Sequence, residues 1–495
     1  MSHRQSVHDL GALVSSFHSL VAVETVEEER VRDIVSEVAA ELQQPFFEWS
    51  VASGFRRGYG LAIGNTQEAH AALKHIAELT GEGIYLLKDL GPHLSKPEVV
   101  RTLRELAEKM MHTRSAMILT GEPLELPRDI ESLAVRFRLP LPDETERRQE
   151  VRQVVEAMKA RQPVHVEMSR EDVQRLVQAL AGLTLHQTRR VVAQAIVADG
   201  KLSADDIERV THLKGEIIER GGILEFHPPE ENRFELGGFA RLKEWLCNAR
   251  MGFTPEAKAL NLDPPKGVLF VGVQGCGKSL AAKAIAREWS LPLLKLDAGR
   301  LYEKYVGESE KNFRRATEMA EAMAPVVLWI DEIEKAFASG TSADADGGLS
   351  QRLFASFLTW LQEKKEGVFV VGAANDLDRL PPELLRKGRF DEIFFVDLPT
   401  QSERESIFNI HLKMRNQDPA KFDVPALSRA SDGYSGAEIE QAVIAALYRA
   451  LHAKAALDTA RVSDALRATV PLSVARAEDV EKLRSKARGR FTPVA

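Results

Sequence analysis

The chain of 495 residues carries a formal net charge of −7, and 44% of its residues are hydrophobic. This length predicts roughly three domains, each large enough for its own core, and the charge balance gives no indication of a nucleic-acid-binding protein. The two cysteines, Cys247 and Cys276, are too few for a disulfide framework. Because no leader pattern or run of ~20 apolar residues is present, we expect a cytoplasmic protein without a membrane segment.

Residues 1–142 are predicted to form an α/β module. Short apolar runs that indicate strands alternate with amphipathic helical patterns. The predicted strands lie at 20–23, 46–49, 84–87, 116–119 and 134–139, and the predicted helices at 27–42, 67–79 and 99–111. Alternation of this kind is typical of a parallel sheet with crossover helices.

The pattern changes after residue 142. Residues 143–220 show helical spacing and are predicted to form a helical subdomain, followed by a linker at 221–233. The α/β pattern returns over 234–400, and 401–495 is predicted to form a helical lid and a helical tail.

The two halves share a pattern of Leu-Pro pairs. In each half, a strand, a Leu-Pro pair, a further strand and a second Leu-Pro pair precede a helix, and an arginine (Arg147 or Arg404) lies five residues after the second proline. Such pairs can recur by chance in a chain with 22 prolines, but the matched order of elements favours an internal repeat.

The strongest functional signal lies in residues 266–279. An apolar run is followed by Gly-x-x-x-x-Gly-Lys-Ser and then by a helical pattern, which is the context of a phosphate-binding loop. Glycines let backbone N–H groups surround phosphate oxygens, the lysine reaches the β- and γ-phosphates, and the serine hydroxyl binds Mg²⁺. The candidate nucleotide-binding residues here are Gly272, Gly275, Cys276, Gly277, Lys278, Ser279 and Leu280.

Two adjacent acids, Asp331 and Glu332, follow an apolar strand at 326–330. In ATPases with a phosphate-binding loop, an aspartate at this place holds Mg²⁺, and a following carboxylate can activate the attacking water. The alternative is a plain strand end before a charged helix start. Because buried charge is costly and the loop is present, we favour the catalytic interpretation.

Three further polar residues each allow two interpretations. Asn375 ends the strand 369–374, where its amide can contact the γ-phosphate or the attacking water, or can simply form a turn. Arg386 and Arg389 form either a solvated basic turn or arginine fingers, which stabilise charge on a transferring phosphoryl group.

Together these motifs resemble an AAA ATPase. The whole chain is similar to the AAA proteins known as hypothetical chloroplast open reading frame forty-six, which occur in plastids, cyanobacteria and other bacteria. The similarity is specific over 234–455 and weaker over 10–145. It rests on Gly237-Gly238, the loop at 272–279, the stretch 304–310, Asp331-Glu332, Asn375, Arg386 with Arg389, and Ser435-Gly436-Ala437, and in the front half on Phe47-Glu48-Trp49-Ser50.

The resemblance implies a P-loop AAA+ core with a parallel sheet and a helical lid, preceded by a degenerate AAA-like α/β module. It implies binding of ATP and Mg²⁺, and a homo-oligomer in the form of a hexameric ring. The implied roles place Gly237 and Gly238 near the adenine, Ser279 and Asp331 on Mg²⁺, Glu332 as activator of water, Asn375 as sensor of the γ-phosphate, Arg386 and Arg389 in the neighbouring subunit's site, and Gly436 and Ala437 at the start of the lid helix.

The resemblance also raises two questions. Lys304-Tyr305-Val306 stands where AAA unfoldases project an aromatic side chain into a central pore, but Tyr305 is equally compatible with packing at a subunit interface. Glu334 stands where such families usually carry aspartate, and we expect this departure to have little effect.

The front half lacks the catalytic residues. If it is a copy of the module, its loop at 24–30 should bind phosphate, yet this loop has no glycine and contains four glutamates. Its counterpart of the acid pair is Lys88-Asp89, so a cation replaces the aspartate that would organise Mg²⁺. We therefore predict a nucleotide-free front module that serves as a second tier or as a platform for partners.

Three functions fit the sequence. The first is an ATPase that remodels a protein or a protein assembly of unknown identity. The second is a nucleotide-gated oligomeric scaffold, for which no candidate substrate would stimulate ATP turnover. The third is a nucleic-acid motor, which the absence of a basic stripe disfavours, so no nucleic-acid partner is expected.

Overall fold

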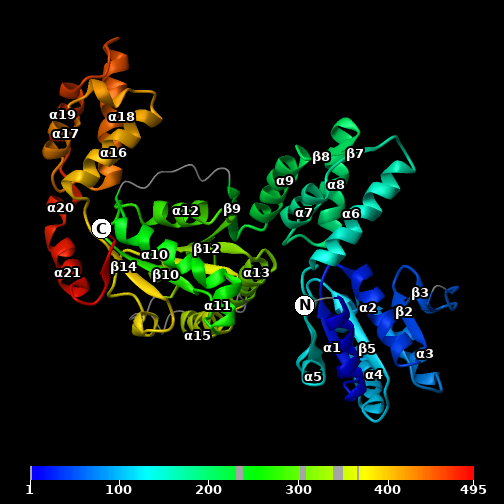
Figure 1. Cartoon of the computed structure of the whole chain (residues 1–495). Helices are drawn as coiled ribbons and strands as arrows, with labels where there is room; N and C mark the ends of the chain where they lie inside the picture. Colours follow the sequence, from blue (N-terminus) through cyan, green and yellow to red (C-terminus); the bar gives the residue numbers. More distant parts are fainter. Residues whose placement is uncertain are drawn as a thin grey trace. The chain divides into compact units, whose positions relative to one another are not determined.

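A computed structural model describes residues 3–58, 60–229, 238–301, 308–337, 349–364 and 367–494. The chain divides into two compact units, Met1–Val210 and Thr211–Ala495 (Figure 1). The boundary between them falls within helix α9 (Asp206–Arg220). The first is the front unit and the second is the rear unit.

The front unit contains a six-stranded sheet in the order β3-β2-β4-β5-β1-β6. Neighbouring strands are parallel except for the antiparallel pair β2 and β3. The strands are β1 (Leu20–Glu24), β2 (Phe46–Ser50), β3 (Gly54–Arg57), β4 (Ile84–Lys88), β5 (Ala116–Gly121) and β6 (Val135–Arg136). Every residue of β5 is buried, as expected for a strand covered on both faces.

Helices cover both faces of this sheet. One apolar core joins the sheet to α1 (His3–Ser15) and α2 (Glu28–Glu41), and another joins it to α3 (Ala69–Glu78) and α4 (Pro97–Met110). A helical part follows the sheet, with α6 (Glu144–Lys159), α7 (Arg170–Ala179), α8 (Leu185–Asp199) and the two short paired strands β7 (His165–Glu167) and β8 (Lys201–Ser203).

The rear unit contains a seven-stranded sheet in the order β15-β14-β10-β13-β12-β11-β9. Only the edge strand β9 is antiparallel to its neighbour. The strands are β9 (Leu224–His227), β10 (Gly267–Gly272), β11 (Leu293–Asp297), β12 (Val326–Asp331), β13 (Val368–Ala374), β14 (Glu392–Val396) and β15 (Thr492–Pro493).

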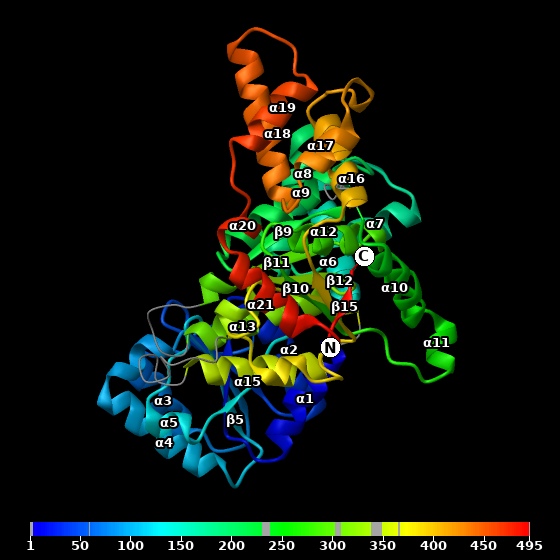
Figure 2. The same cartoon turned by 90° about the vertical axis from the view of Figure 1, so that its left-hand side faces the viewer.

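Two apolar cores again flank the sheet, and the helices that cover it can be followed in Figures 1 and 2. Helices α10 (Ala240–Arg250), α12 (Lys278–Glu288) and α21 (Ala477–Ala487) pack on one face, and α13 (Glu308–Ala322), α14 (Ile333–Ala336) and α15 (Leu349–Glu363) on the other. A helical lid with its own apolar core consists of α16 (Gln401–Met414), α17 (Val424–Ala430), α18 (Gly436–His452) and α19 (Thr459–Arg467).

Five neighbouring strands have the same order in the two sheets. The front order β6-β1-β5-β4-β2 parallels the rear order β14-β10-β13-β12-β11, so that β1 corresponds to β10, β5 to β13 and β4 to β12. The edges differ, because β3 follows β2 in the chain whereas β9 precedes β10, and because β15 adds a seventh strand to the rear sheet. The two arginines after the second Leu-Pro pair also form matching bonds. Arg147 donates to Pro142 O and Val177 O, and Arg404 donates to Pro399 O and Ser428 O. This shared architecture agrees with an internal repeat.

Several elements differ from the sequence-based prediction. The predicted linker 221–233 contains β9, which belongs to the rear sheet, and the predicted helical tail ends in β15, which pairs with β14. Helix α1 and strand β3 were not predicted, and the strand predicted at 134–139 is limited to β6. The remaining predicted domain boundaries stay predictions.

Candidate functional site

The phosphate-binding loop lies between the central strand β10 and the start of α12 in the rear unit. Gly275 and Gly277 have φ angles of 78° and 94°, a left-handed conformation that favours glycine. A Cβ atom on Gly272 would lie 2.0 Å from the carbonyl oxygen of Val396 on β14. The glycines of the motif therefore meet a requirement of the backbone itself, and the loop has the conformation in which N–H groups can face an anion.

Lys278 lies inside this loop. Its side chain is only 6% exposed, and its Nζ donates to the carbonyl oxygens of Gly272 at 2.8 Å and of Val273 at 2.9 Å. Burial lowers the pKa of the Lys278 ammonium to about 8. The loop thus holds a partly desolvated ammonium group, which fits the binding of a triphosphate.

The other loop residues differ in exposure. Ser279 is half-buried in the first turn of α12, and Leu280 is exposed. Cys276 is buried, and burial raises the pKa of its thiol to about 12. Cys276 is therefore a neutral packing group rather than a reactive thiolate.

The acid pair lies two strands away from the loop. In the order β10-β13-β12, Asp331 ends β12 and accepts a hydrogen bond from the N–H of Glu332 at 3.1 Å. Glu332 has a φ of 48°, which is unusual for a residue with a side chain and costs about 1–2 kcal/mol. Its carboxylate, 39% exposed, pairs with Lys335 Nζ at 2.6 Å. Strained backbone of this kind is often found at functional sites.

Asn375 follows β13, the strand between the loop and the acid pair. Its backbone N–H donates to Glu334 Oε1 on α14 at 2.9 Å. Glu334 is 4% exposed, and burial raises the pKa of its carboxyl. A glutamate in place of the usual aspartate at position 334 was expected to have little effect, whereas Glu334 contacts the backbone of the candidate sensor.

Helix α18 of the lid begins against the phosphate-binding loop. Ser435 caps α18, and the N–H of Ala437 in the first turn donates to Gly275 O at 3.1 Å. Gly436 is the first residue of the helix. On the core side, Gly238 has a φ of 86°, and a Cβ atom there would lie 2.2 Å from Glu403 Oε1 on α16. The predicted Gly238, Gly436 and Ala437 thus all lie where core and lid meet.

The two candidate arginine fingers differ. Arg386 is exposed just after the short 3₁₀ helix Pro382–Leu385, whereas Arg389 is half-buried and donates to Leu358 O on α15 at 3.0 Å. Arg386 has the accessibility that a finger needs, and Arg389 is bonded within its own chain. Gly237, Lys304, Tyr305 and Val306 lie outside the described residues.

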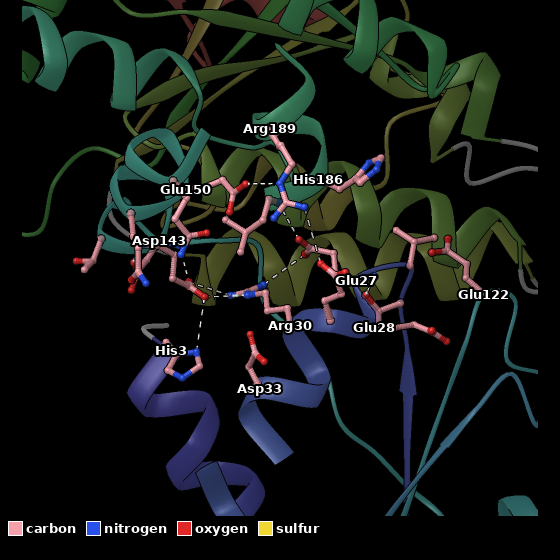
Figure 3. Close-up of a pocket in the computed structure, with 18 of the residues that line it drawn as sticks. His3, Glu27, Glu28, Arg30, Asp33, Glu122, Asp143, Glu150, His186 and Arg189 are labelled. Atoms are coloured by element: carbon pink, nitrogen blue, oxygen red, sulfur yellow. Dashed lines mark hydrogen bonds and ion pairs between the residues drawn. The ribbon is translucent and has the colours of Figure 1, made fainter. Parts of the chain in front are cut away.

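The front unit has a pocket of about 1060 Å³ at the corresponding place (Figure 3). It is lined by the loop after β1, by α2 and by the starts of α6 and α8. Acidic side chains outnumber basic ones in its lining, but among the described residues no group of three or more His, Cys, Asp or Glu is arranged to hold a metal ion.

Side chains of the protein connect the walls of this pocket. The Arg30 guanidinium, 4% exposed, bonds Glu146 on α6 at 2.8 and 2.9 Å and also Pro140 O. Glu27 Oε1 accepts the backbone N–H of Leu185, the first residue of α8, at 2.8 Å. Arg189 of α8 pairs with Glu150 of α6 at 2.7 Å (Figure 3).

Comparisons with known proteins agree with this geometry. Residues 268–398 match the family "ATPase family associated with various cellular activities (AAA)". Residues 6–139 and 145–221 match the N-terminal and second domains of the SpoVK-like AAA ATPases. The chain is 37% identical over 484 residues to "Uncharacterized AAA domain-containing protein ycf46" of Guillardia theta, an alignment that covers 96% of this chain and 94% of the relative.

The chain belongs to the ycf46 family of AAA ATPases. The ycf46 protein of Pyropia yezoensis is 36% identical to this chain over an alignment that covers 96% of each protein. Similarity extends to other AAA proteins over shorter regions, such as the "Cell division cycle protein 48 homolog" of Archaeoglobus fulgidus, which is 28% identical over 58% of this chain and 42% of its own length. The predicted family and the α/β fold with parallel sheets are thereby confirmed.

In this ycf46-family protein, no helix within the described ranges is long and apolar enough to cross a membrane.

Two contacts of the site were not found from the sequence. The bond between Glu334 and Asn375 joins residues 41 positions apart, and the only sequence signal was the glutamate in an unusual place. Phe239, with a φ of 60°, directly precedes α10 and has its ring 3.5 Å from where a Cβ on Gly277 would lie.

Proposed function

We propose that the rear unit hydrolyses ATP with Mg²⁺ and couples hydrolysis to the remodelling of a protein or protein assembly. The observation that carries this proposal is the convergence of four groups at the carboxyl ends of three adjacent strands. These groups are the buried Lys278 in its loop, Asp331, Glu332 and Asn375. Ligands of open α/β sheets bind at this edge.

The donor set fits both ATP and its metal ion. Lys278 and the loop N–H groups would hold the phosphates, and Ser279 and Asp331 would hold Mg²⁺, which offsets phosphate charge when it is bound. Glu332 would accept a proton from the attacking water while the water oxygen forms a bond to the γ-phosphorus. At the same time, the bond between the γ-phosphorus and the oxygen that bridges it to the β-phosphate would break. Asn375 would orient that water or the γ-phosphate.

The contact between lid and loop favours a coupled motion. Because Ala437 N–H bonds Gly275 O, a change in the loop's contacts with nucleotide is transmitted directly to the start of α18. We propose that Arg386 completes the site of a neighbouring subunit in a ring, that Gly237 lies near the adenine, and that Tyr305 contacts substrate or a neighbour. The ring, its substrate and a cytoplasmic location remain predictions.

Steady-state ATP turnover of the full chain tests this function. We expect phosphate release that requires Mg²⁺, is abolished by EDTA and rises when an unfolded model protein is added. Turnover that neither proteins nor DNA stimulate would favour the nucleotide-gated scaffold, and salt-dependent stimulation by DNA would favour the nucleic-acid motor.

For the front unit, we propose a module that uses no nucleotide and whose helical part is held by side chains instead. Lys88 ends β4 where Asp331 ends β12, and the next residue, Asp89, has a φ of 51° that matches the 48° of Glu332. Glu27 accepts a hydrogen bond from the backbone N–H of Leu185 at the start of α8. Gly275 O accepts a corresponding bond from the N–H of Ala437 at the start of α18. A carboxylate at this helix start would repel the negative charge of a triphosphate. It interacts favourably with the partial positive charge at the N-terminus of the helix.

A Lys278→Ala chain tests whether the front unit binds nucleotide. Because the front pocket offers neither a glycine loop nor an aspartate at the end of β4, we expect this variant to show no residual ATP binding in calorimetric titration with Mg²⁺. The wild-type chain should bind one ATP per chain. A second, Lys278-independent site would contradict a nucleotide-free front unit.

An Arg30→Ala chain tests the side-chain network. Removing the guanidinium leaves Glu27 and Glu146, whose side chains are 8% and 11% exposed, without their cation. We expect the front unit to lose about 3–5 kcal/mol of stability. Amide hydrogen exchange of peptides from residues 1–210 measures this change. The control, Arg136→Ala, removes an arginine with 46% exposure and should change stability by less than about 1 kcal/mol. Equal effects of the two variants would contradict the proposed role of Arg30.

A further inference from the structure

Glu334 is a buried carboxylate beside the candidate catalytic groups. It lies in the short helix α14, which follows Asp331 and Glu332 directly. The residue is 4% exposed, whereas both members of the acid pair are more exposed. Burying a carboxylate is costly, so a buried glutamate that neither binds Mg²⁺ nor activates water needs another reason for its place.

One oxygen of Glu334 has a clear partner. Oε1 accepts the backbone N–H of Asn375 at 2.9 Å, across the gap between α14 and the end of β13. A hydrogen bond between a backbone N–H and a carboxylate is stronger than one between neutral groups. This bond therefore fixes the backbone from which the Asn375 side chain projects.

The surroundings of the other oxygen are also informative. Glu334 Oε2 is buried and forms no hydrogen bond within the part of the chain that the structure describes. The charged groups that act on Glu334 are Glu332 and Lys278, a like charge and an opposite charge. Burial outweighs the attraction of the Lys278 ammonium, so that the pKa of the Glu334 carboxyl is raised.

We propose that Glu334 is a positioning residue that holds Asn375 at the place where it acts on the γ-phosphate or the attacking water. The proposal rests on the proposed ATPase function. Glu334 connects two parts of the site, because its helix continues from the acid pair and its carboxylate accepts a hydrogen bond from the backbone that follows β13. Its effect should fall on the chemical step rather than on ATP binding.

The test compares Glu334→Ala with Glu334→Gln in the full chain. Alanine removes the acceptor for Asn375 N–H, and a misplacement of about 1 Å near the reacting atoms can lower a rate about a hundredfold. We expect Glu334→Ala to lower kcat about ten- to a hundredfold with little change in KM. Glutamine keeps an acceptor oxygen at the same reach, so Glu334→Gln should recover most of this loss.

A matched control removes another carboxylate that bonds a backbone N–H. Glu392 is the first residue of β14, at the opposite end of that strand from the residue that pairs with Gly272 of the loop. It accepts hydrogen bonds from Ile393 N at 3.2 Å and from Thr492 Oγ1 at 2.9 Å. We expect Glu392→Ala to leave kcat within about twofold of wild type. An equal fall in kcat for Glu392→Ala and Glu334→Ala would attribute the effect to general destabilisation and overturn the proposal.

A double-mutant cycle asks whether Glu334 acts through Asn375. If it does, adding Glu334→Ala to Asn375→Ala should lower kcat no further. Additive losses would overturn the proposal, as would wild-type kcat for Glu334→Ala. Should Glu334→Ala fail to fold, Glu334→Met, which removes the acceptor oxygen but keeps a side chain of similar length, takes its place in the cycle.

A readout independent of turnover separates this proposal from the proposed function. Hydrogen exchange of peptides that cover 368–376 should accelerate in Glu334→Ala and stay near wild type in Glu334→Gln. If the wild-type chain did not hydrolyse ATP, the ATPase proposal would fail while the exchange result still decided whether Glu334 anchors Asn375. Unchanged exchange in Glu334→Ala would overturn the anchoring.

Discussion

A Glu332→Gln chain is expected to bind ATP as wild type does and to hydrolyse it at least about a hundredfold more slowly. Glutamine preserves the shape of the side chain but cannot accept a proton from the attacking water, and general-base catalysis typically contributes 10²–10⁴ in rate. Lys278 and the loop are untouched, so the phosphate contacts remain. Phosphate release and ATP titration measure the two effects separately.

The control for this variant is Glu363→Gln, which changes an exposed glutamate at the end of α15 and should have wild-type turnover. Near-wild-type hydrolysis by Glu332→Gln would reject the assignment of Glu332 as the base. The same variant is useful for finding partners, because a chain that retains ATP should also retain a bound substrate during a pull-down.

The second large effect is expected for Arg386→Ala. Arginine fingers contribute about 10³–10⁵ to kcat, so this variant should lose about a thousandfold in turnover if Arg386 acts on a neighbouring subunit. Turnover of the wild-type chain should rise with protein concentration, because the finger acts only in an assembly. The control Arg379→Ala removes another arginine of the same region, 67% exposed, and should retain turnover.

Mixing experiments show whether the finger acts between subunits. A chain with Arg386→Ala and Arg389→Ala has an intact loop, and a Lys278→Ala chain has intact arginines. Mixing these two inactive chains should restore part of the activity, since some interfaces then combine an intact loop with an intact finger. Full activity of a dilute monomer would reject action in trans.

The sequence predicted the central part of each sheet and pointed to the residues of the candidate rear site. The loop at 272–279 and the acid pair are contiguous motifs, so their chemistry can be read without knowing the fold. The placement of Asn375 between them also followed, because parallel strands bring their carboxyl ends to one edge. The correspondence of Lys88 with Asp331 depended on the repeat, and the matching φ angles of Asp89 and Glu332 agree with it.

Other features depended on contacts between distant residues. Strand β9 is four residues long and includes Glu225 and His227, so neither its length nor its composition distinguishes it from a loop. The difference between Arg386 and Arg389 comes from a single bond to Leu358, 31 positions away. Glu334 was judged by its neighbours in sequence, whereas its partner is the backbone of another strand.

Strand β9 has a practical consequence for anyone who wishes to prepare the ATPase part alone. A shortened protein beginning at residue 234, where composition suggests a domain start, would lack the strand that covers β11 and would expose an open sheet edge together with the apolar surface that Leu224 and Phe226 cover. Open edges of this kind promote aggregation. Truncations that begin at or before Thr211 keep the edge covered and are the better choice for expression.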